Sequence, residues 1–293
     1  MGLRIKTNIA SINTQRTMNS TTSAIGESMA KLSSGYRINK AADDAAGLAV
    51  SESMKAKMRS LGQAQRNALD GVSIVQTAEG SMNEVSNILI RLRELATQAA
   101  SDTLSNTERS YTNREYTQLV SEVQRISNTT NWNGTPLLSG SDGVGEESMF
   151  TLYIGAGNGQ VENTDTMRIG VENIKINAEE LGLGTGAEIG PEKIGDAFSR
   201  ETAAGKLDII DKALENISSS RSYLGATQSR LNSAINNLGI QIENLKSANS
   251  RIRDVDFAEE TATLTQNRIL QQAGASVLAQ ANQAPEVAMQ LLR

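Results

Sequence analysis

The helix-breaking residues of this chain gather in its middle and separate two long amphipathic ends. The only prolines are Pro136, Pro191 and Pro285, and half of the 24 glycines fall between Gly140 and Gly195. Proline removes a backbone donor and glycine carries a high entropic cost, so both disfavour long helices. This order brings the two ends side by side. It predicts a mainly α fold: a long antiparallel coiled-coil or bundle rod formed by both termini, with a small β element in the middle.

The strongest periodic signal lies in the first half, where small and apolar residues recur every three or four positions. The series continues for about 39 residues, or about 58 Å of helix at 1.5 Å per residue. A period of 3.5 residues predicts a coiled-coil seam. Its members are Leu61, Ala64, Ala68, Gly71, Val75, Ala78, Met82, Val85, Leu89, Leu92, Ala96 and Ala99.

A second helix is predicted over about 106–126. Ser105 is suited to cap its start, and Glu108 three residues later completes the pattern of a capping box. The helical pattern fails near Asn128, where the turn-forming stretch 131–136 follows. The seam of this helix consists of Tyr116, Leu119, Val123 and Ile126.

The middle and the second half complete the pattern. Short alternating runs at 148–154 and 166–171 predict two strands around a turn region at Gly155–Gly159. The 3.5-residue repeat then returns, and it resumes once more beyond Arg253. Its members before that point are Leu224, Leu231, Ile235, Leu238, Ile242, Leu245 and Ile252.

The seams at the two ends are weak, because alanine, amides and hydroxyl side chains surround them. Burying one Leu or Ile contributes about 1.5–3 kcal/mol, whereas ordering each residue costs about 1–2 kcal/mol of backbone entropy. We therefore expect the ends to stay largely disordered in a free chain and to fold against neighbouring copies. The apolar members are Ile5, Ile9, Ile12, Met18, Ile25, Met29 and Leu32 at one end, and Leu270, Ala273, Val277, Ala281, Ala284, Ala288 and Leu291 at the other.

The composition argues against an enzyme and against a resident metal or cofactor. The chain has no cysteine and no histidine, which removes disulfides, the commonest general base and the commonest transition-metal ligand. Gly155–Gly159 superficially resembles a phosphate-binding loop, but no helical pattern follows, so a turn is predicted. Asp43 and Asp44 are expected to be solvated or locally salt-bridged. A Ser–Lys catalytic pair is the one nucleophilic arrangement that the sequence leaves open.

Charge and hydropathy restrict the partners. The net charge of −5 argues against general nucleic-acid binding. No run of about 18 apolar residues predicts a membrane span, and the first residues lack the apolar core of a signal peptide. Residues 1–66 carry a net charge of +6, and residues 139–201 carry −8. The basic start suggests a contact surface and the acidic middle a solvent-facing one, although ordinary scatter of surface charge is the alternative.

Several long motifs resemble the terminal regions of the bacterial flagellin family. The resemblance covers about 1–140 and 200–293, whereas the middle matches no named pattern. The motifs are KLSSGYRIN at 31–39, ADDAAGLA at 42–49, QRNA at 65–68, QTAEG at 76–80, RLRELATQ at 91–98, SRIRD at 250–254, QAGA at 272–275, LAQANQ at 278–283 and LLR at 291–293.

The resemblance implies a structural subunit that self-assembles into the bacterial flagellar filament for swimming motility. It implies an extracellular location, reached by type III export without a cleaved signal peptide. The expected parts are an inner coiled-coil domain (1–45 and 252–293), a helical rod domain (46–138 and 200–251) and a short variable surface segment (139–199). Implied partners are other copies, hook-associated and cap proteins, and an export chaperone at about 255–293.

The resemblance and the seams together give two sets of contact residues. Toll-like receptor 5 of animal hosts is implied as a partner of the free subunit, at positions that match Leu89, Arg91, Leu95 and Glu115. The predicted subunit interface consists of Ile5, Ile9, Ile12, Leu32, Leu89, Leu92, Leu238, Leu245, Leu270, Val277 and Leu291.

Two alternatives stay open at this point. A flagellar hook–filament junction protein shares the terminal helices, but it would cap or join the filament instead of polymerising. The match at 291–293 favours flagellin over it. A chemoreceptor-like helical hairpin also has two long heptad arms, but no membrane span or sensing module is visible in this sequence.

Overall fold

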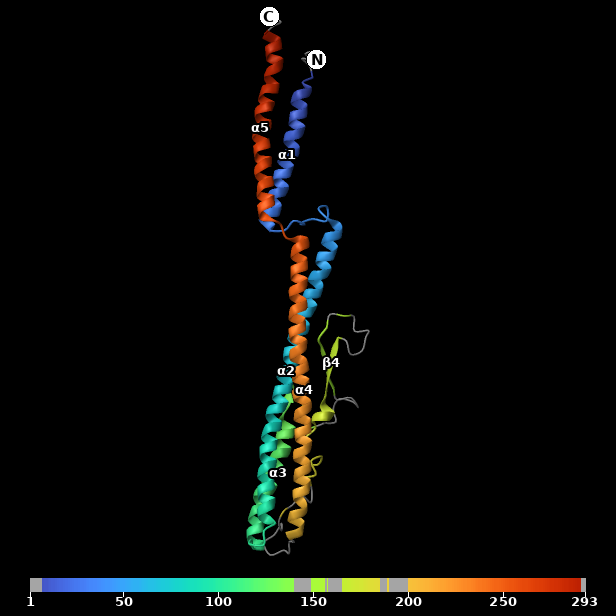
Figure 1. The fold of residues 1–293 in the computed structure, drawn as a ribbon, viewed down its shortest axis with the longest axis vertical. Helices are drawn as coiled ribbons and strands as arrows, with labels where there is room; N and C mark the ends of the chain where they lie inside the picture. Colours follow the sequence, from blue (N-terminus) through green and yellow to red (C-terminus); the bar gives the residue numbers. More distant parts are fainter. Residues whose placement is uncertain are drawn as a thin grey trace. The chain divides into compact units, whose positions relative to one another are not determined.

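The protein is described by a computed structural model that covers residues 7–139, 149–155, 157, 165–184, 189 and 200–290. The fold is mainly helical with two small antiparallel sheets in the middle of the chain, which confirms the predicted fold class (Figure 1). In chain order its elements are α1 (Ile9–Ser34), α2 (Ala45–Ala99), α3 (Asn106–Thr129), β1 (Asn131–Trp132), β2 (Thr135–Pro136), β3 (Met149–Tyr153), β4 (Thr166–Gly170), the 3-10 helix η1 (Val171–Ile174), α4 (Arg200–Arg253) and α5 (Phe257–Gln290).

The chain forms two compact units. The first consists of Met1–Met58 and Glu243–Arg293 and contains α1 and α5, and the second consists of Arg59–Ile242. The helices α2 and α4 each contribute residues to both units. The three-part division expected from the sequence places its boundaries elsewhere, at 45 and 252, and it stays a prediction.

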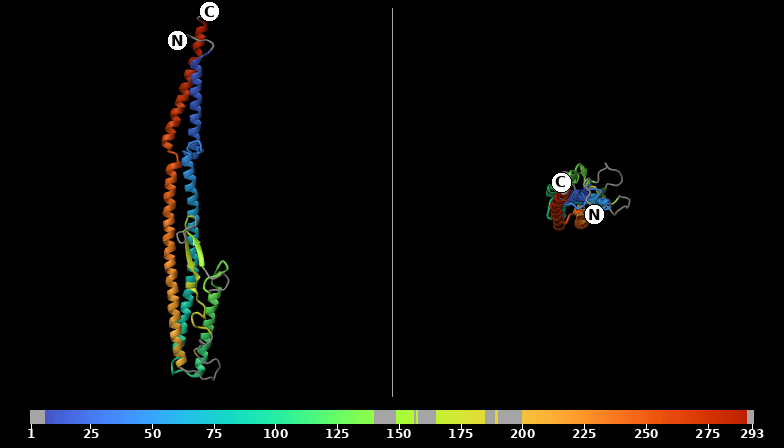
Figure 2. Two further views of the ribbon diagram at one scale, coloured as in Figure 1. Left: turned by 90° about the vertical axis from the view of Figure 1, so that its right-hand side faces the viewer. Right: turned by 90° about the horizontal axis from the view of Figure 1, so that it is seen from above.

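The core of the second unit lies between α2, α3 and α4. All twelve members of the predicted seam on α2 are buried, which confirms the 3.5-residue repeat. Tyr116 and Val123 of α3 and Leu224 and Leu231 of α4 complete the same cluster. Figure 2 shows α2, α3 and α4 running side by side. Large residues fill the space near the end of α2, while alanine and glycine allow closer approach nearer its middle.

The predicted capping box and strands are present. Ser105 Oγ accepts from the Glu108 N–H at 3.3 Å, and Glu108 Oε2 accepts from the Ser105 N–H at 2.7 Å. This backbone hydrogen bond lowers the pKa of Glu108. The turn at 131–136 is a small hairpin, in which Asn133 and Gly134 have φ angles of 49° and 83°. Positive φ at both central residues is the requirement that an Asn-Gly pair meets.

The hairpin of β3 and β4 packs over a glycine of α2. A Cβ at Gly71 would clash with Leu152 Cδ1, so the missing side chain makes room for β3. Asn67 Nδ2 donates to the Tyr153 carbonyl at 2.9 Å, and the Gly170 N–H donates to Tyr223 Oη at 3.1 Å. The β element is therefore fixed to both α2 and α4.

Candidate interaction surface

The terminal helices α1 and α5 pack side by side in the first unit (Figures 1 and 2). On α5 the half-buried and buried positions recur every 3.5 residues, which is the period of a coiled-coil seam. Only one of these residues, Leu264, is both large and apolar and less than 9% exposed. The seam positions of α5 are Glu260, Leu264, Asn267, Gln271, Gly274, Leu278 and Ala281, and those of α1 include Ser11, Thr14, Met18, Thr21, Ile25 and Ser28.

Hydrogen bonds hold this seam together at the start of α1. Asn8 Nδ2 donates to the Ala281 carbonyl at 2.7 Å, and Ser11 Oγ donates to Asn282 Oδ1 at 2.9 Å. Farther along the pair the polar contacts are longer, and Lys31 Nζ lies 3.9 Å from Glu260 Oε2. The two side chains are only 31% and 15% exposed, so this ion pair lies partly within the seam.

The apolar side chains of α1 and α5 lie mostly on the outside of the pair. Ile9 and Ile12 are each 55% exposed, and Leu270 and Val277 are 51% and 52% exposed. Met29, Phe257 and Ile269 are also exposed. The helix pair thus has mostly polar and small side chains within its seam and several large apolar side chains on its surface, whereas a soluble two-helix hairpin buries its apolar face.

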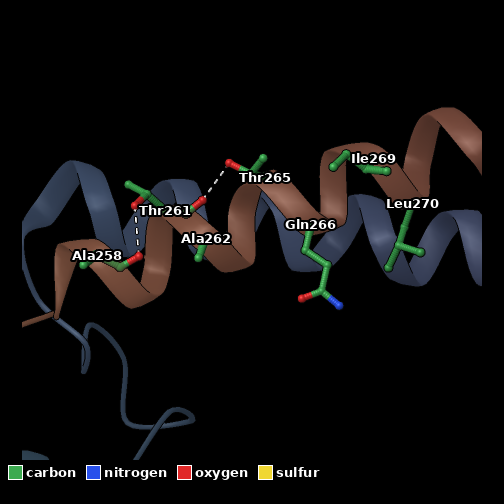
Figure 3. Close-up of a pocket in the computed structure, with 7 residues that line it drawn as sticks. All are labelled: Ala258, Thr261, Ala262, Thr265, Gln266, Ile269 and Leu270. Carbon is green, nitrogen blue, oxygen red and sulfur yellow. Dashed lines mark hydrogen bonds between the residues drawn. The ribbon is translucent and has the colours of Figure 1, made fainter.

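A shallow groove of about 560 Å³ lies on this outer surface of α5. Its lining residues repeat at intervals of three and one, so they form one stripe along the helix, and Figure 3 shows them with α1 behind. Thr265 Oγ1 donates to the Thr261 carbonyl at 2.8 Å, so this hydroxyl is satisfied by the helix backbone. The lining residues are Ala258, Thr261, Ala262, Thr265, Gln266, Ile269 and Leu270.

The connectors of the first unit pair with each other. The Arg37 N–H donates to the Arg253 carbonyl at 2.7 Å, and the Val255 N–H donates to the Gly35 carbonyl at 3.0 Å. Gly35 ends α1 with a φ of 73°, a conformation that glycine adopts without strain. The Arg253 guanidinium lies 4.7 Å from the centre of the Tyr36 ring. These contacts join the end of α1 to the start of α5.

Asp43 and Asp44 act locally on the same connector. Asp43 Oδ2 accepts from the backbone N–H groups of Lys40 and Asn39, each at 2.9 Å, and these bonds lower the pKa of Asp43. Asp44 Oδ1 accepts from the Gly47 N–H at 2.9 Å in the first turn of α2. Backbone capping therefore accounts for both carboxylates. Among the described residues no group of three or more carboxylates could hold a metal ion.

The predicted interface residues fall into four groups. Ile9, Ile12, Leu270 and Val277 are exposed in the first unit, and Leu32 and Leu245 are half-buried there. Leu89, Leu92 and Leu238 are buried inside the second unit. Leu89 and Leu92 pack in its core cluster, against residues of the same chain. Ile5 and Leu291 lie outside the described residues. The prediction omitted Phe257 and Ile269, although each is an apolar residue next to a polar stretch of α5.

The predicted receptor residues divide in the same way. Leu89 and Leu95 are buried in the core, whereas Arg91 and Glu115 are about half exposed. Arg91 Nη2 lies 2.8 Å from Glu115 Oε1, and Arg91 Nη1 lies 2.9 Å from Glu94 Oε2. These hydrogen bonds, led by that from Glu115, raise the pKa of Arg91. The pair joins the outer faces of α2 and α3.

Both ends of the chain match known family patterns. Residues 5–142 match the family described as the bacterial flagellin N-terminal helical region, and residues 207–292 match the bacterial flagellin C-terminal helical region. A flagellin of Halalkalibacterium halodurans is 42% identical over 289 residues, which cover 99% of each chain. This chain belongs to the bacterial flagellin family. A flagellin of Bacillus subtilis is 40% identical and covers 99% of this chain and 100% of its own.

Other relatives place this flagellin among filament proteins. The flagellar filament 33 kDa core protein of Treponema phagedenis is 38% identical, with 99% of each chain covered. A hook-associated protein of Vibrio parahaemolyticus is 16% identical, with a TM-score of 0.59 over 72% of this chain and 100% of its own, which shows a shared fold alone. This flagellin is a structural subunit of the flagellar filament. No described helix combines the length and apolar composition needed to span a membrane.

Proposed function

We propose that copies of this flagellin polymerise by covering the outer apolar surface of the α1–α5 pair. The observation that carries the proposal is the inverted arrangement of that pair, with a polar seam inside and Ile9, Ile12, Leu270 and Val277 outside. Exposed apolar side chains gain free energy when a neighbour removes them from water. A free chain has no other described element over this surface. Neighbouring copies supply one, and the groove on α5 accepts their side chains.

The remaining predicted interface residues support assembly in other ways. Leu32 and Leu245 are half-buried and contribute their exposed edges to the same contact. Leu89 and Leu92, in the core cluster of the second unit, hold that unit rigid, so that contacts between copies are made by a fixed surface. In this proposal the protein acts mechanically, through contacts between its copies, and carries out no catalytic step.

The chain leaves the cell through the flagellar type III export channel and functions outside the cell. Support comes from the absence of cysteine and from the polar α1–α5 seam, which is easily separated. An export chaperone covers 255–293 before assembly, because α5 then lacks a neighbour over its apolar surface. Hook-associated and cap proteins occupy the same surface at the two ends of the filament.

Toll-like receptor 5 is the proposed host partner of the free subunit. Arg91 and Glu115 offer the accessible contacts, since both are about half exposed on adjacent helices. Leu89 and Leu95 are buried and would act by fixing the position of α2. A free subunit with Arg91→Ala should bind the receptor ectodomain more weakly than the unsubstituted chain.

The assembly proposal is tested by the critical concentration for polymerisation. Leu270→Gln keeps helix propensity and adds a polar group to a side chain that is 51% exposed. Completing the burial of such a side chain is worth about 1 kcal/mol, half of the full value, so the critical concentration should rise about fivefold. Ser276→Gln, at another exposed position of α5, is the matched control. Equal critical concentrations for L270Q and the unsubstituted chain, measured by sedimentation, would refute this surface.

A further inference from the structure

A proline lies inside α5 and changes the hydrogen bonding of the turn before it. The helix runs from Phe257 to Gln290 and includes Pro285. In an α-helix the N–H of residue 285 would donate to the carbonyl of Ala281, four residues earlier. Proline has no N–H, so the Ala281 carbonyl loses that donor. A half-buried carbonyl without a donor is costly, and a replacement donor is therefore favoured.

Asn8 supplies the replacement. Its Nδ2 donates to the Ala281 carbonyl at 2.7 Å, across 273 residues of sequence. Its Oδ1 meanwhile accepts from the Ser11 N–H at 3.1 Å and caps the start of α1. One carboxamide thus uses its acceptor on its own helix and its donor on the partner helix. The neighbouring bond from Ser11 Oγ to Asn282 Oδ1 lies beside it.

Away from the Gly35–Val255 and Arg37–Arg253 backbone bonds, which lie at the other end of the pair, the α1–α5 seam has few contacts that distinguish one axial register from another. Its positions carry mostly small, hydroxyl or amide side chains, with Gly274 on α5 and Ser28 on α1. Large knobs normally fix the register of two helices, and the large apolar members of this seam are few, among them Met18, Ile25, Leu264 and Leu278. The Ala281 carbonyl differs, because it is the only acceptor within α5 that a proline releases.

We propose that Asn8 and Pro285 act as a pair that fixes the axial register of α1 against α5. Pro285 exposes one carbonyl along a uniform helix, and Asn8 recognises it while capping its own helix. The specificity resides in a backbone acceptor rather than in side-chain packing. This proposal concerns the helix pair within one chain and holds whether or not copies assemble through its outer surface.

Cysteine cross-linking measures the register directly, because the chain has no cysteine of its own. Thr22 Oγ1 and Gln271 Nε2 lie 3.3 Å apart, so Thr22→Cys with Gln271→Cys reports the native register. Met29→Cys with Gln271→Cys reports a displacement of one heptad. Cross-links within one chain change mobility on a denaturing gel, whereas cross-links between chains give dimers. The full-length chain is oxidised both free and as sedimented polymer.

The variants separate the two roles of Asn8. Asn8→Ser keeps a good cap and removes the amide donor. It should lower the ratio of native to displaced cross-link about fivefold, the effect of losing one hydrogen bond. With Pro285→Ala, residue 285 regains its N–H and satisfies Ala281, so Asn8→Ser should change the ratio little. Asn13→Ser, at an exposed position of α1, is the matched control and should leave it unchanged.

Three results would overturn the pairing. The first is that Asn8→Ser lowers the ratio of native to displaced cross-link equally with and without Pro285. The second is that Asn8→Ser changes this ratio in neither background. The third is that the native cross-link is absent from both the free chain and the polymer. Failure of the chains to sediment would instead count against assembly through the outer surface, and the cross-link ratio of the free chain would still decide the register.

Discussion

Arg109 closes the C-terminal end of α2, and we expect its loss to destabilise the second unit strongly. The side chain is only 8% exposed. Its Nε donates to the carbonyl of Ala99, the last residue of α2, at 2.9 Å. Its Nη2 donates to the Ser101 carbonyl at 2.8 Å, and its Nη1 donates to Asn106 Oδ1 at 3.2 Å. One guanidinium therefore joins the end of α2, the connector and the start of α3.

The magnitude follows from the number of bonds and their burial. A hydrogen bond to a charged group contributes about 1.5–3 kcal/mol, and a buried carbonyl without a donor carries a further penalty. Arg109→Ala should lower the free energy of unfolding by about 3–5 kcal/mol. Arg109→Lys keeps the charge but has no planar fork that reaches three acceptors, so a loss of about 2 kcal/mol is expected. Arg114→Lys, on the exposed face of α3, should change it by less than about 0.5 kcal/mol.

Trp132 makes the assay specific for the second unit. It is the only tryptophan of the chain, and it packs against the core of that unit. Its fluorescence during urea unfolding reports this core without contributions from α1 and α5. If the urea unfolding curves of R109K and R114K superimpose, the planar guanidinium of Arg109 contributes no stability to the second unit, and the predicted role of Arg109 is refuted.

Three further outcomes are expected. Tyr116→Phe should leave the free energy of unfolding unchanged or raise it by up to about 1 kcal/mol in the same assay, because its buried hydroxyl has no hydrogen-bond partner among the described residues and burial raises its pKa to about 12. Leu92→Asp or Leu245→Asp should abolish sedimentable filaments, since burying an unpaired charge costs several kcal/mol; normal filaments from both would contradict the assigned seams. The hydrogen bond from Arg93 lowers the pKa of Asp211 in the folded chain. The Arg93–Asp211 pair therefore contributes its full stability above the pKa that Asp211 has in the unfolded chain, and this contribution is lost as the pH falls through the pKa of the folded chain. The unfolding midpoint of Asp211→Asn should therefore approach that of the unsubstituted chain on acidification from pH 7, and a constant difference would count against the pair.

The sequence predicted the second unit well because its seam is satisfied within one chain. Apolar residues from Leu61 to Ala99 repeat at 3.5 positions, and the helices that cover them belong to the same molecule. The capping box at Ser105 and the hairpin of β3 and β4 follow local rules that a short window of sequence contains. Local chemistry and intramolecular burial are the signals that periodicity detects.

Contacts between distant polar groups left no such signal. Arg109 has the appearance of a surface residue of α3, and only the position of the Ala99 carbonyl makes it a buried cap. The break after Gly35 and its pairing with Val255 were likewise not predicted, because a backbone bridge does not depend on side-chain identity. The predicted seam continued past Pro285, and α5 likewise continues through that residue to Gln290.

The chain ends show that a hydrophobic pattern identifies a face to be buried without naming the molecule that buries it. The sequence placed Ile9, Ile12, Leu270 and Val277 on seams, and the structure places these four residues on the outside of the α1–α5 pair. Periodicity identifies a face that needs burial, but it does not distinguish burial by the same chain from burial by another. A helix pair that leaves its own apolar stripe exposed gains stability when another molecule covers that stripe. Such exposed apolar surface is expected of a filament subunit, because the surface that folding leaves in water is buried when subunits bind, and its burial then stabilises the assembly.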